Sequence, residues 1–150
     1  FYQLPASGRI PFQRFNLCLL FLHGFPEYGG AWDAILPRFA DRFHAVAPDQ
    51  RGYNLSEKPK GVRSYQIKEC VEDIVGLIRS QKRKKAIVIG HDWGGVVAWW
   101  LAKLHPDCVE KLIVLNSPHP TVFTHLLSRS LSQLIRSWYI LFFQIPWLPE

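Results

Sequence analysis

The chain has 150 residues, of which 48% are hydrophobic and 20% charged, an ordinary composition for one globular domain with a modest core. Its formal net charge is +6. The basic residues are scattered along the chain except for the cluster Lys82-Arg83-Lys84-Lys85 before an apolar run. This distribution favours a solvated connector over a nucleic-acid-binding patch. Its three cysteines are widely spaced and lack metal-ligand spacing, which favours free thiols over a disulfide framework or a metal site.

The expected compartment is the cytoplasm, because free thiols are typical there and no signal-peptide pattern is visible. The most apolar stretch, residues 138–148, is interrupted by Gln144 and Pro146 and is shorter than the ~18 residues that a membrane span needs. The sequence contains no methionine, and its first residues read like the middle of a strand. We therefore expect it to be a piece of a longer chain.

The apolar runs 17–22 and 43–47 predict two buried strands. Between them, apolar residues from Trp32 to Ala40 recur at helical spacing, and Pro37 is the position where this helix would kink or shorten. An amphipathic stripe over 67–78 predicts a second helix, followed by a strand over 86–89, a helix over 96–104 and a strand over 112–115. This alternation predicts an α/β fold with a mostly parallel sheet and helices on both faces.

Chemically unusual residues follow each of the four predicted strands. They lie in residues 23–27, 49–53, 90–95 and 116–120. Because ligands of open parallel sheets bind at the carboxyl ends of the strands, we expect these four segments to surround one site.

Asp92 lies in the segment Gly90-His91-Asp92-Trp93-Gly94-Gly95, between a predicted strand and a predicted helix. A side chain on so tight a turn has strained backbone angles, and only small neighbours fit where the helix begins over the strand. Gly90, Gly94 and Gly95 provide that room, as glycines do in the G-x-S-x-G turn that presents a nucleophilic serine. A phosphate-binding loop is disfavoured, since neither G-x-G-x-x-G nor a lysine is present. We therefore predict that Asp92 is a nucleophile.

A carboxylate nucleophile implies a particular chemistry. It is ionised at neutral pH, so it can displace a leaving group from saturated carbon without a base, and an ester results. Water attack on that ester places negative charge on the carbonyl oxygen, which calls for NH donors aimed at it. The candidates by position are the NH groups of Trp93 and Phe25, and Gly24 would let the Phe25 loop approach closely. The side chains of Trp93, Phe25 and Pro26 are expected to line the substrate pocket.

Taken together, these motifs resemble the epoxide hydrolase branch of the α/β-hydrolases. The resemblance rests on residues 23–27, on 49–53 with Ser56, Lys58 and Pro59, on 90–95, and on Phe143-Gln144-Ile145-Pro146-Trp147. It implies an α/β-hydrolase fold truncated at the start of a helical cap. Residues 1–116 would form the N-terminal part of the core domain, and 117–150 the start of the cap.

By this resemblance, Asp92 opens the ring of a small apolar epoxide and water then releases a vicinal diol. Two cap tyrosines would protonate the epoxide oxygen, and a histidine oriented by an acid would activate the water. Family order places the acid and the histidine after the nucleophile, here beyond Glu150. No metal or cofactor is expected, and the oligomeric state is left open.

The remaining polar residues are given structural roles. His23 and His91 are expected to hold the geometry of the loop and the Asp92 turn. Asp49 and Arg51 are expected to fix the loop after the second strand by pairing there. Glu27 is not expected to act as an acid or a base.

Rival reactions differ at single positions. Haloalkane dehalogenases also have aspartate followed by tryptophan, but typically have asparagine at position 25, and many have an acid at position 116. Fluoroacetate dehalogenases have arginine at position 93, and serine esterases require serine at position 92. Haloalkane dehalogenation therefore remains the alternative reaction, and a catalytically inactive fragment or binding module the alternative of another class.

Overall fold

The computed structural model describes residues 17–129, 138 and 142. The described chain divides into two compact units that meet between Ser117 and Pro118. This division lies one residue from the domain boundary expected from the sequence. That the second unit begins a helical cap stays a prediction, and the aromatic motif at 143–147 lies outside the described residues.

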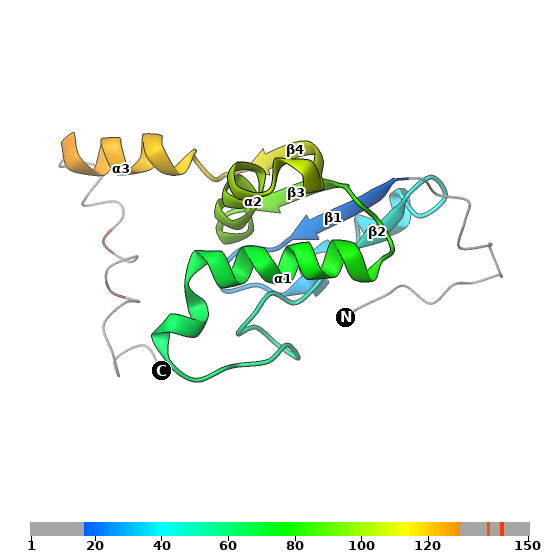
Figure 1. Cartoon of the computed structure of the whole chain (residues 1–150), viewed down its shortest axis with the longest axis horizontal. Coiled ribbons are helices and arrows are strands. Elements are labelled where there is room, and N and C mark those ends of the chain that lie inside the picture. Colours follow the sequence, from blue (N-terminus) through cyan, green and yellow to red (C-terminus); the bar gives the residue numbers. More distant parts are fainter. Residues whose placement is uncertain (1–16, 130–137, 139–141, 143–150) are drawn as a thin grey trace. The chain divides into compact units, whose positions relative to one another are not determined.

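The first unit contains a four-stranded parallel sheet (Figure 1). Its strands are β1 (Cys18–Leu22), β2 (His44–Val46), β3 (Ala86–His91) and β4 (Val109–Leu115), in the spatial order β2-β1-β3-β4. Strand β1 is central and pairs with both β2 and β3. The predicted α/β fold with a parallel sheet is confirmed.

Two α-helices belong to this unit, α1 (Ile67–Ser80) and α2 (Trp93–Leu104), and α3 (Pro120–Arg129) belongs to the second unit. Four short 3-10 turns complete the described elements: η1 (Gly29–Trp32), η2 (Leu36–Arg38), η3 (Val62–Tyr65) and η4 (Pro106–Cys108). The helix predicted from Trp32 to Ala40 is wrong, because η1 and η2 take its place. Pro37 explains the difference, since proline has no NH with which to continue α-helical hydrogen bonding and is accommodated instead in the first turn of η2.

The hydrophobic core lies on both faces of the sheet. On one face, Leu20 and Val88 pack in a cluster with buried residues of α1 and α2, such as Val71 and Val97. On the other face, Phe21 packs with Trp32 and Leu36 of the 3-10 turns, along with Ile87 and Ile89. Alternate strand residues therefore face opposite clusters, as the period-two geometry of a strand requires.

Two elements begin earlier than the sequence indicates. Helix α2 starts at Trp93, three residues before the predicted start, and so includes Gly94 and Gly95. Strand β4 starts at Val109 instead of residue 112. In both cases tertiary pairing overrides weak local propensity, since Gly94 is buried in the packing of α2 and β4 follows β3 along its length.

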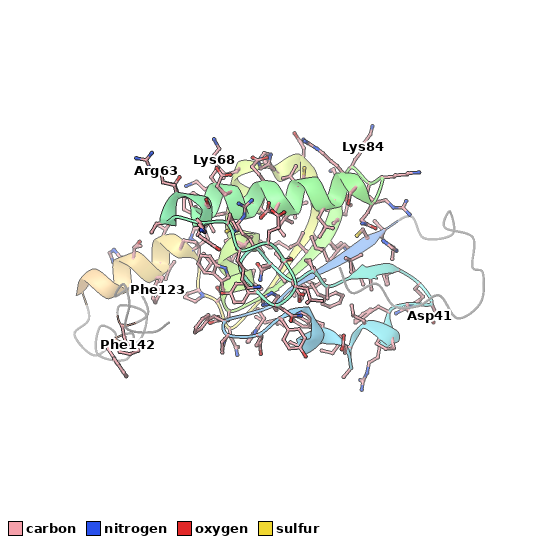
Figure 2. All side chains as sticks on the ribbon, turned by 90° about the horizontal axis from the view of Figure 1, so that it is seen from below. Asp41, Arg63, Lys68, Lys84, Phe123 and Phe142 are labelled. Atoms are coloured by element: carbon pink, nitrogen blue, oxygen red, sulfur yellow. The ribbon has the colours of Figure 1, made fainter. Side chains whose placement is uncertain are left out.

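The cationic connector after α1 is solvent-exposed at Lys82, Lys84 and Lys85. Figure 2 shows Lys84 and Lys68 pointing away from the ribbon. Cys18 and Cys70 are buried free thiols, and burial raises the pKa of Cys18 to about 11. Among the residues that the structure describes, no helix is long and apolar enough to cross a bilayer, and no group of three or more His, Cys, Asp or Glu side chains could hold a metal ion.

Candidate active site

Asp92 lies on the sharp turn that joins strand β3 to helix α2. Its backbone angles are φ 49° and ψ −116°, in a region that costs a non-glycine residue on the order of 1–3 kcal/mol. Its NH donates to Leu115 O at 3.1 Å, and its carbonyl accepts from Gly95 N at 3.0 Å. The turn is therefore held from the neighbouring strand and from the helix. The carboxylate lies at the helix N-terminus, whose positive dipole end favours an anion.

The three glycines of this turn occupy positions where a side chain does not fit. A Cβ at Gly90 would lie 2.5 Å from Gly94 O, and one at Gly94 would press against Leu22 O and lie 2.6 Å from His23 O. A Cβ at Gly95 would collide with the side chain of Ser117. Helix α2 can begin this close to β1 and β3 only because these positions lack a side chain.

The loop after β1 brings a backbone donor to the Asp92 carboxylate. Phe25 N donates to Asp92 Oδ1 at 3.0 Å, although 67 residues separate them. A Cβ at Gly24 would lie 2.8 Å from the Asp92 Cβ, so glycine permits the approach. The other predicted donor, Trp93 N, belongs to the first residue of α2, where NH groups have no intrahelical acceptor.

Glu27 links this loop to the Asp92 turn. Its Oε2 accepts from Gly24 N at 3.1 Å and lies 3.4 Å from Nδ1 of His91. The Glu27 NH also donates to Gly24 O at 3.0 Å. His91, which the sequence predicts to hold the geometry of the Asp92 turn, contacts the loop through the Glu27 carboxylate, which the sequence did not assign to it.

His23 is completely buried and uses both ring nitrogens. Gln50 N donates to its Nε2 at 3.0 Å, and its Nδ1 lies 2.9 Å from Gly24 O. Because Nε2 accepts, Nδ1 carries the proton and the imidazole is neutral. Burial lowers the pKa of His23, against the opposing effects of the Gly24 carbonyl and the carboxylates of Asp49 and Glu27.

A turn after β2 supplies the other groups around His23. Tyr53 N donates to Gln50 O at 3.0 Å, and Gly52 between them has φ 89°, as the third residue of a type II turn requires. The Gln50 side chain donates to His23 O at 2.6 Å. The Tyr53 ring meets the imidazole edge-on, with centroids 4.9 Å apart. The sequence marks this segment as polar but does not reveal that it packs on His23.

Asp49 and Arg51 both stabilise loops, but not by pairing with each other. Asp49 accepts from Gly29 N at 2.8 Å and from the Asn54 amide at 2.9 Å. Arg51 instead forms a two-pronged ion pair with Asp73 of α1, with N–O distances of 2.7 and 2.6 Å. The expectation of a pairing at 49–51 is wrong, because Arg51 reaches across to the helix.

The residues predicted to line the substrate pocket do not line the cavity found in the first unit. That cavity has a volume of about 620 Å³ and lies between α1 and residues 48–59. Phe25, Pro26 and Trp93 are absent from its lining. Phe25 is 46% exposed, whereas the Trp93 side chain packs against the core cluster beneath α2. Their role as pocket lining stays a prediction.

A parallel sheet with a strained strand-to-helix turn, and a donor loop facing that turn, defines the α/β-hydrolase architecture. The chain belongs to this family: residues 18–144 match the family model described as alpha/beta hydrolase fold. Its relatives include the AB hydrolase superfamily protein YfhM of Bacillus subtilis, 49% identical over 88% of this chain and 46% of that protein. Epoxide hydrolase 1 of Caenorhabditis elegans is 48% identical over 88% of this chain and 33% of that protein.

Solved structures give the same assignment. An epoxide hydrolase of Bacillus megaterium in complex with an inhibitor superposes with a TM-score of 0.83 at 42% identity, covering 87% of this chain and 46% of that one. The resemblance to epoxide hydrolases is therefore confirmed. The chain spans between a third and about half of the length of these curated relatives.

Proposed function

We propose that this chain carries the nucleophile and the oxyanion donors of an enzyme that opens small apolar epoxides to vicinal diols. The observation that carries the proposal is the 3.0 Å hydrogen bond from Phe25 N to Asp92 Oδ1, at a strained turn on a helix N-terminus. The names of the relatives support the choice of epoxides as substrate.

The first step would be alkylation of Asp92. With Oδ1 held by the Phe25 NH, the second carboxylate oxygen forms a bond to a ring carbon of the epoxide while the ring carbon–oxygen bond breaks. The released alkoxide takes a proton from an acid, which the family resemblance places in the cap. The product of this step is an ester of Asp92.

The second step would be hydrolysis of the ester. Water adds to the ester carbonyl carbon, and negative charge develops on the oxygen that Phe25 N already contacts. Donors fixed in advance stabilise such a charge more than water does, because they need no reorganisation. Water gives up a proton to a base, which the family resemblance places beyond Glu150. Collapse of the intermediate then breaks the bond between the Asp92 carboxyl carbon and Oδ2, so that Oδ2 leaves as the second hydroxyl of the diol and the oxygen from water restores the Asp92 carboxylate.

The experiment is to incubate the chain with styrene oxide and, separately, with a bromoalkane, and to map covalent adducts by mass spectrometry. We expect styrene oxide to add its mass to the peptide that contains Asp92. Asp92→Asn should lower the rate of adduct formation by on the order of a thousandfold or more, whereas Asp107→Asn, a change at an exposed aspartate on η4, should leave it unchanged.

The two substrates separate the alternatives. Bromide release with an Asp92 adduct from the bromoalkane, and none from the epoxide, would favour haloalkane dehalogenation. The absence of any Asp92 adduct from either substrate would contradict the proposal and favour the inactive or binding role. Diol release measured on a longer chain that includes the cap then tests the complete reaction.

A further inference from the structure

The tyrosine beside His23 has no role in the chemistry derived above. We propose that Tyr53 is a positioning residue, whose ring keeps His23 neutral and in place and thereby holds the Phe25 NH against Asp92. This inference rests on the proposed function where it concerns alkylation of Asp92. Its structural part stands without that function.

The position of the oxyanion loop depends on one tautomer of His23. Gln50 N donates to Nε2 at 3.0 Å, while Nδ1 donates to Gly24 O at 2.9 Å. Gly24 directly precedes Phe25, so the imidazole bonds to the backbone one residue before the NH that contacts Asp92. A proton on Nε2 would face the Gln50 NH and break the hydrogen bond from Gln50, so the imidazole would move, and with it the Gly24 carbonyl that Nδ1 holds.

The aromatic ring of Tyr53 contacts this imidazole. The two rings meet at 80° with centroids 4.9 Å apart, and the His23 side chain is fully buried. Tyr53 and Gln50 lie on the same turn, closed by the bond from Tyr53 N to Gln50 O at 3.0 Å. One turn therefore supplies both the hydrogen bond to His23 and the ring that covers it.

The carboxylates near His23 would favour its protonation if the Tyr53 ring did not shield the imidazole from water. The carboxylates of Asp49 and Glu27 favour an imidazolium, whereas burial lowers the pKa of His23 and is the larger effect. The Tyr53 phenol adds no charge, because burial and, secondarily, the carboxylate of Asp92 raise its pKa. If the ring were removed, water would reach the imidazole, the effect of burial would shrink and the two carboxylates would favour protonation.

The test compares Tyr53→Ala with Tyr53→Phe in the full 150-residue chain. Tyr28→Ala is the matched control, because Tyr28 is an exposed tyrosine that packs on Gly30. The His23 pKa is measured by NMR titration of the imidazole carbon-bound protons, with the His23 signal assigned by its loss in His23→Gln. The rate at which styrene oxide alkylates Asp92 is measured over the same pH range.

We expect Tyr53→Ala to raise the His23 pKa and to shift the acid limb of the alkylation profile to higher pH by the same amount. Tyr53→Phe and Tyr28→Ala should match the wild type in both measurements. An unchanged His23 pKa in Tyr53→Ala would overturn the proposal, and so would a Tyr53→Phe variant as strongly shifted as Tyr53→Ala, since the hydroxyl would then carry the effect.

A second variant and the NMR titration test the role of Tyr53 even where Tyr53→Ala or the alkylation assay fails. If Tyr53→Ala does not fold, Tyr53→Leu is titrated in its place; a raised His23 pKa and faster amide exchange at Gln50 and Phe25 support the proposal, and wild-type values contradict it. If no variant, wild type included, alkylates Asp92, the proposed function fails, while the NMR titration still decides the role of Tyr53.

Discussion

A single carboxylate oxygen, Oε2 of Glu27, contacts both the loop after β1 and the Asp92 turn. It lies 3.1 Å from Gly24 N and 3.4 Å from His91 Nδ1. The Gly24 NH is the more important partner, because Gly24 is buried and a buried donor without an acceptor is costly. The contact with His91 is partly exposed, so it contributes little to stability.

Glu27→Ala is expected to lower the free energy of unfolding by about 1 kcal/mol, because the Gly24 NH loses its acceptor. Glu27→Gln should cost less, since the amide oxygen can still accept from Gly24. Urea unfolding followed by circular dichroism measures both changes. Asp41→Ala, at an exposed carboxylate that points away from the body of the protein (Figure 2), is the control and should be neutral. Equal losses in Glu27→Ala and Asp41→Ala would contradict this role.

At the scale of elements, the site depends on how closely helix α2 can begin beside strand β1. The two meet where Gly94 N donates to His23 O at 3.0 Å. The same His23 carbonyl accepts from the Gln50 side chain. The start of α2, the end of β1 and the turn after β2 therefore converge on one residue, and a shift of any of them would displace the Phe25 NH from Asp92.

Gly94→Ala should destabilise the protein by about 3 kcal/mol, because its Cβ would press against the carbonyl groups of Leu22 and His23. Gly76→Ala is the matched control within a helix, since no atom lies within 4 Å of its added Cβ. It should stabilise the protein by about 1 kcal/mol through higher helix propensity. Denaturant midpoints for both variants test the pair, and a neutral Gly94→Ala would show that α2 can move away at little cost.

At the scale of the molecule, strand β4 forms an edge of the sheet within the part of the chain that the structure describes. Ile113 and Leu115 on this strand are 46% and 43% exposed. Apolar side chains on an edge strand with open backbone groups favour pairing with another chain. The 150-residue chain should therefore self-associate through β4 as its concentration rises.

Ile113→Lys is expected to reduce this self-association, because a charge on the edge strand opposes strand pairing. Val62→Lys makes the same chemical change at a residue that is 89% exposed on η3, away from the sheet edge. Sedimentation velocity over a concentration series compares the two variants with the wild type. If Val62→Lys reduced association as much as Ile113→Lys, net charge rather than the β4 edge would be responsible.

Features that depend on neighbouring residues can be predicted from the sequence, whereas most contacts between residues far apart in the chain cannot. Continuous apolar runs and helical spacing are local patterns, so they located the strands and α1, and the glycines around Asp92 located the strand-to-helix turn. Pro37 indicated where the helix predicted from Trp32 to Ala40 would be interrupted. The contacts of Arg51 with Asp73, 22 residues away, and of Gln50 with His23, 27 residues away, have no local pattern.

The sequence by itself therefore determined the parallel α/β architecture and the place of Asp92 on its turn, because backbone sterics and hydrophobic periodicity act over a few residues. The sequence also predicts the Phe25 NH as a donor near Asp92. Only the tertiary structure decided the other contacts around that turn: Glu27 between Gly24 and His91, and Tyr53 on the ring of His23. These contacts join the ends of different strands, and packing of the whole sheet sets their distances.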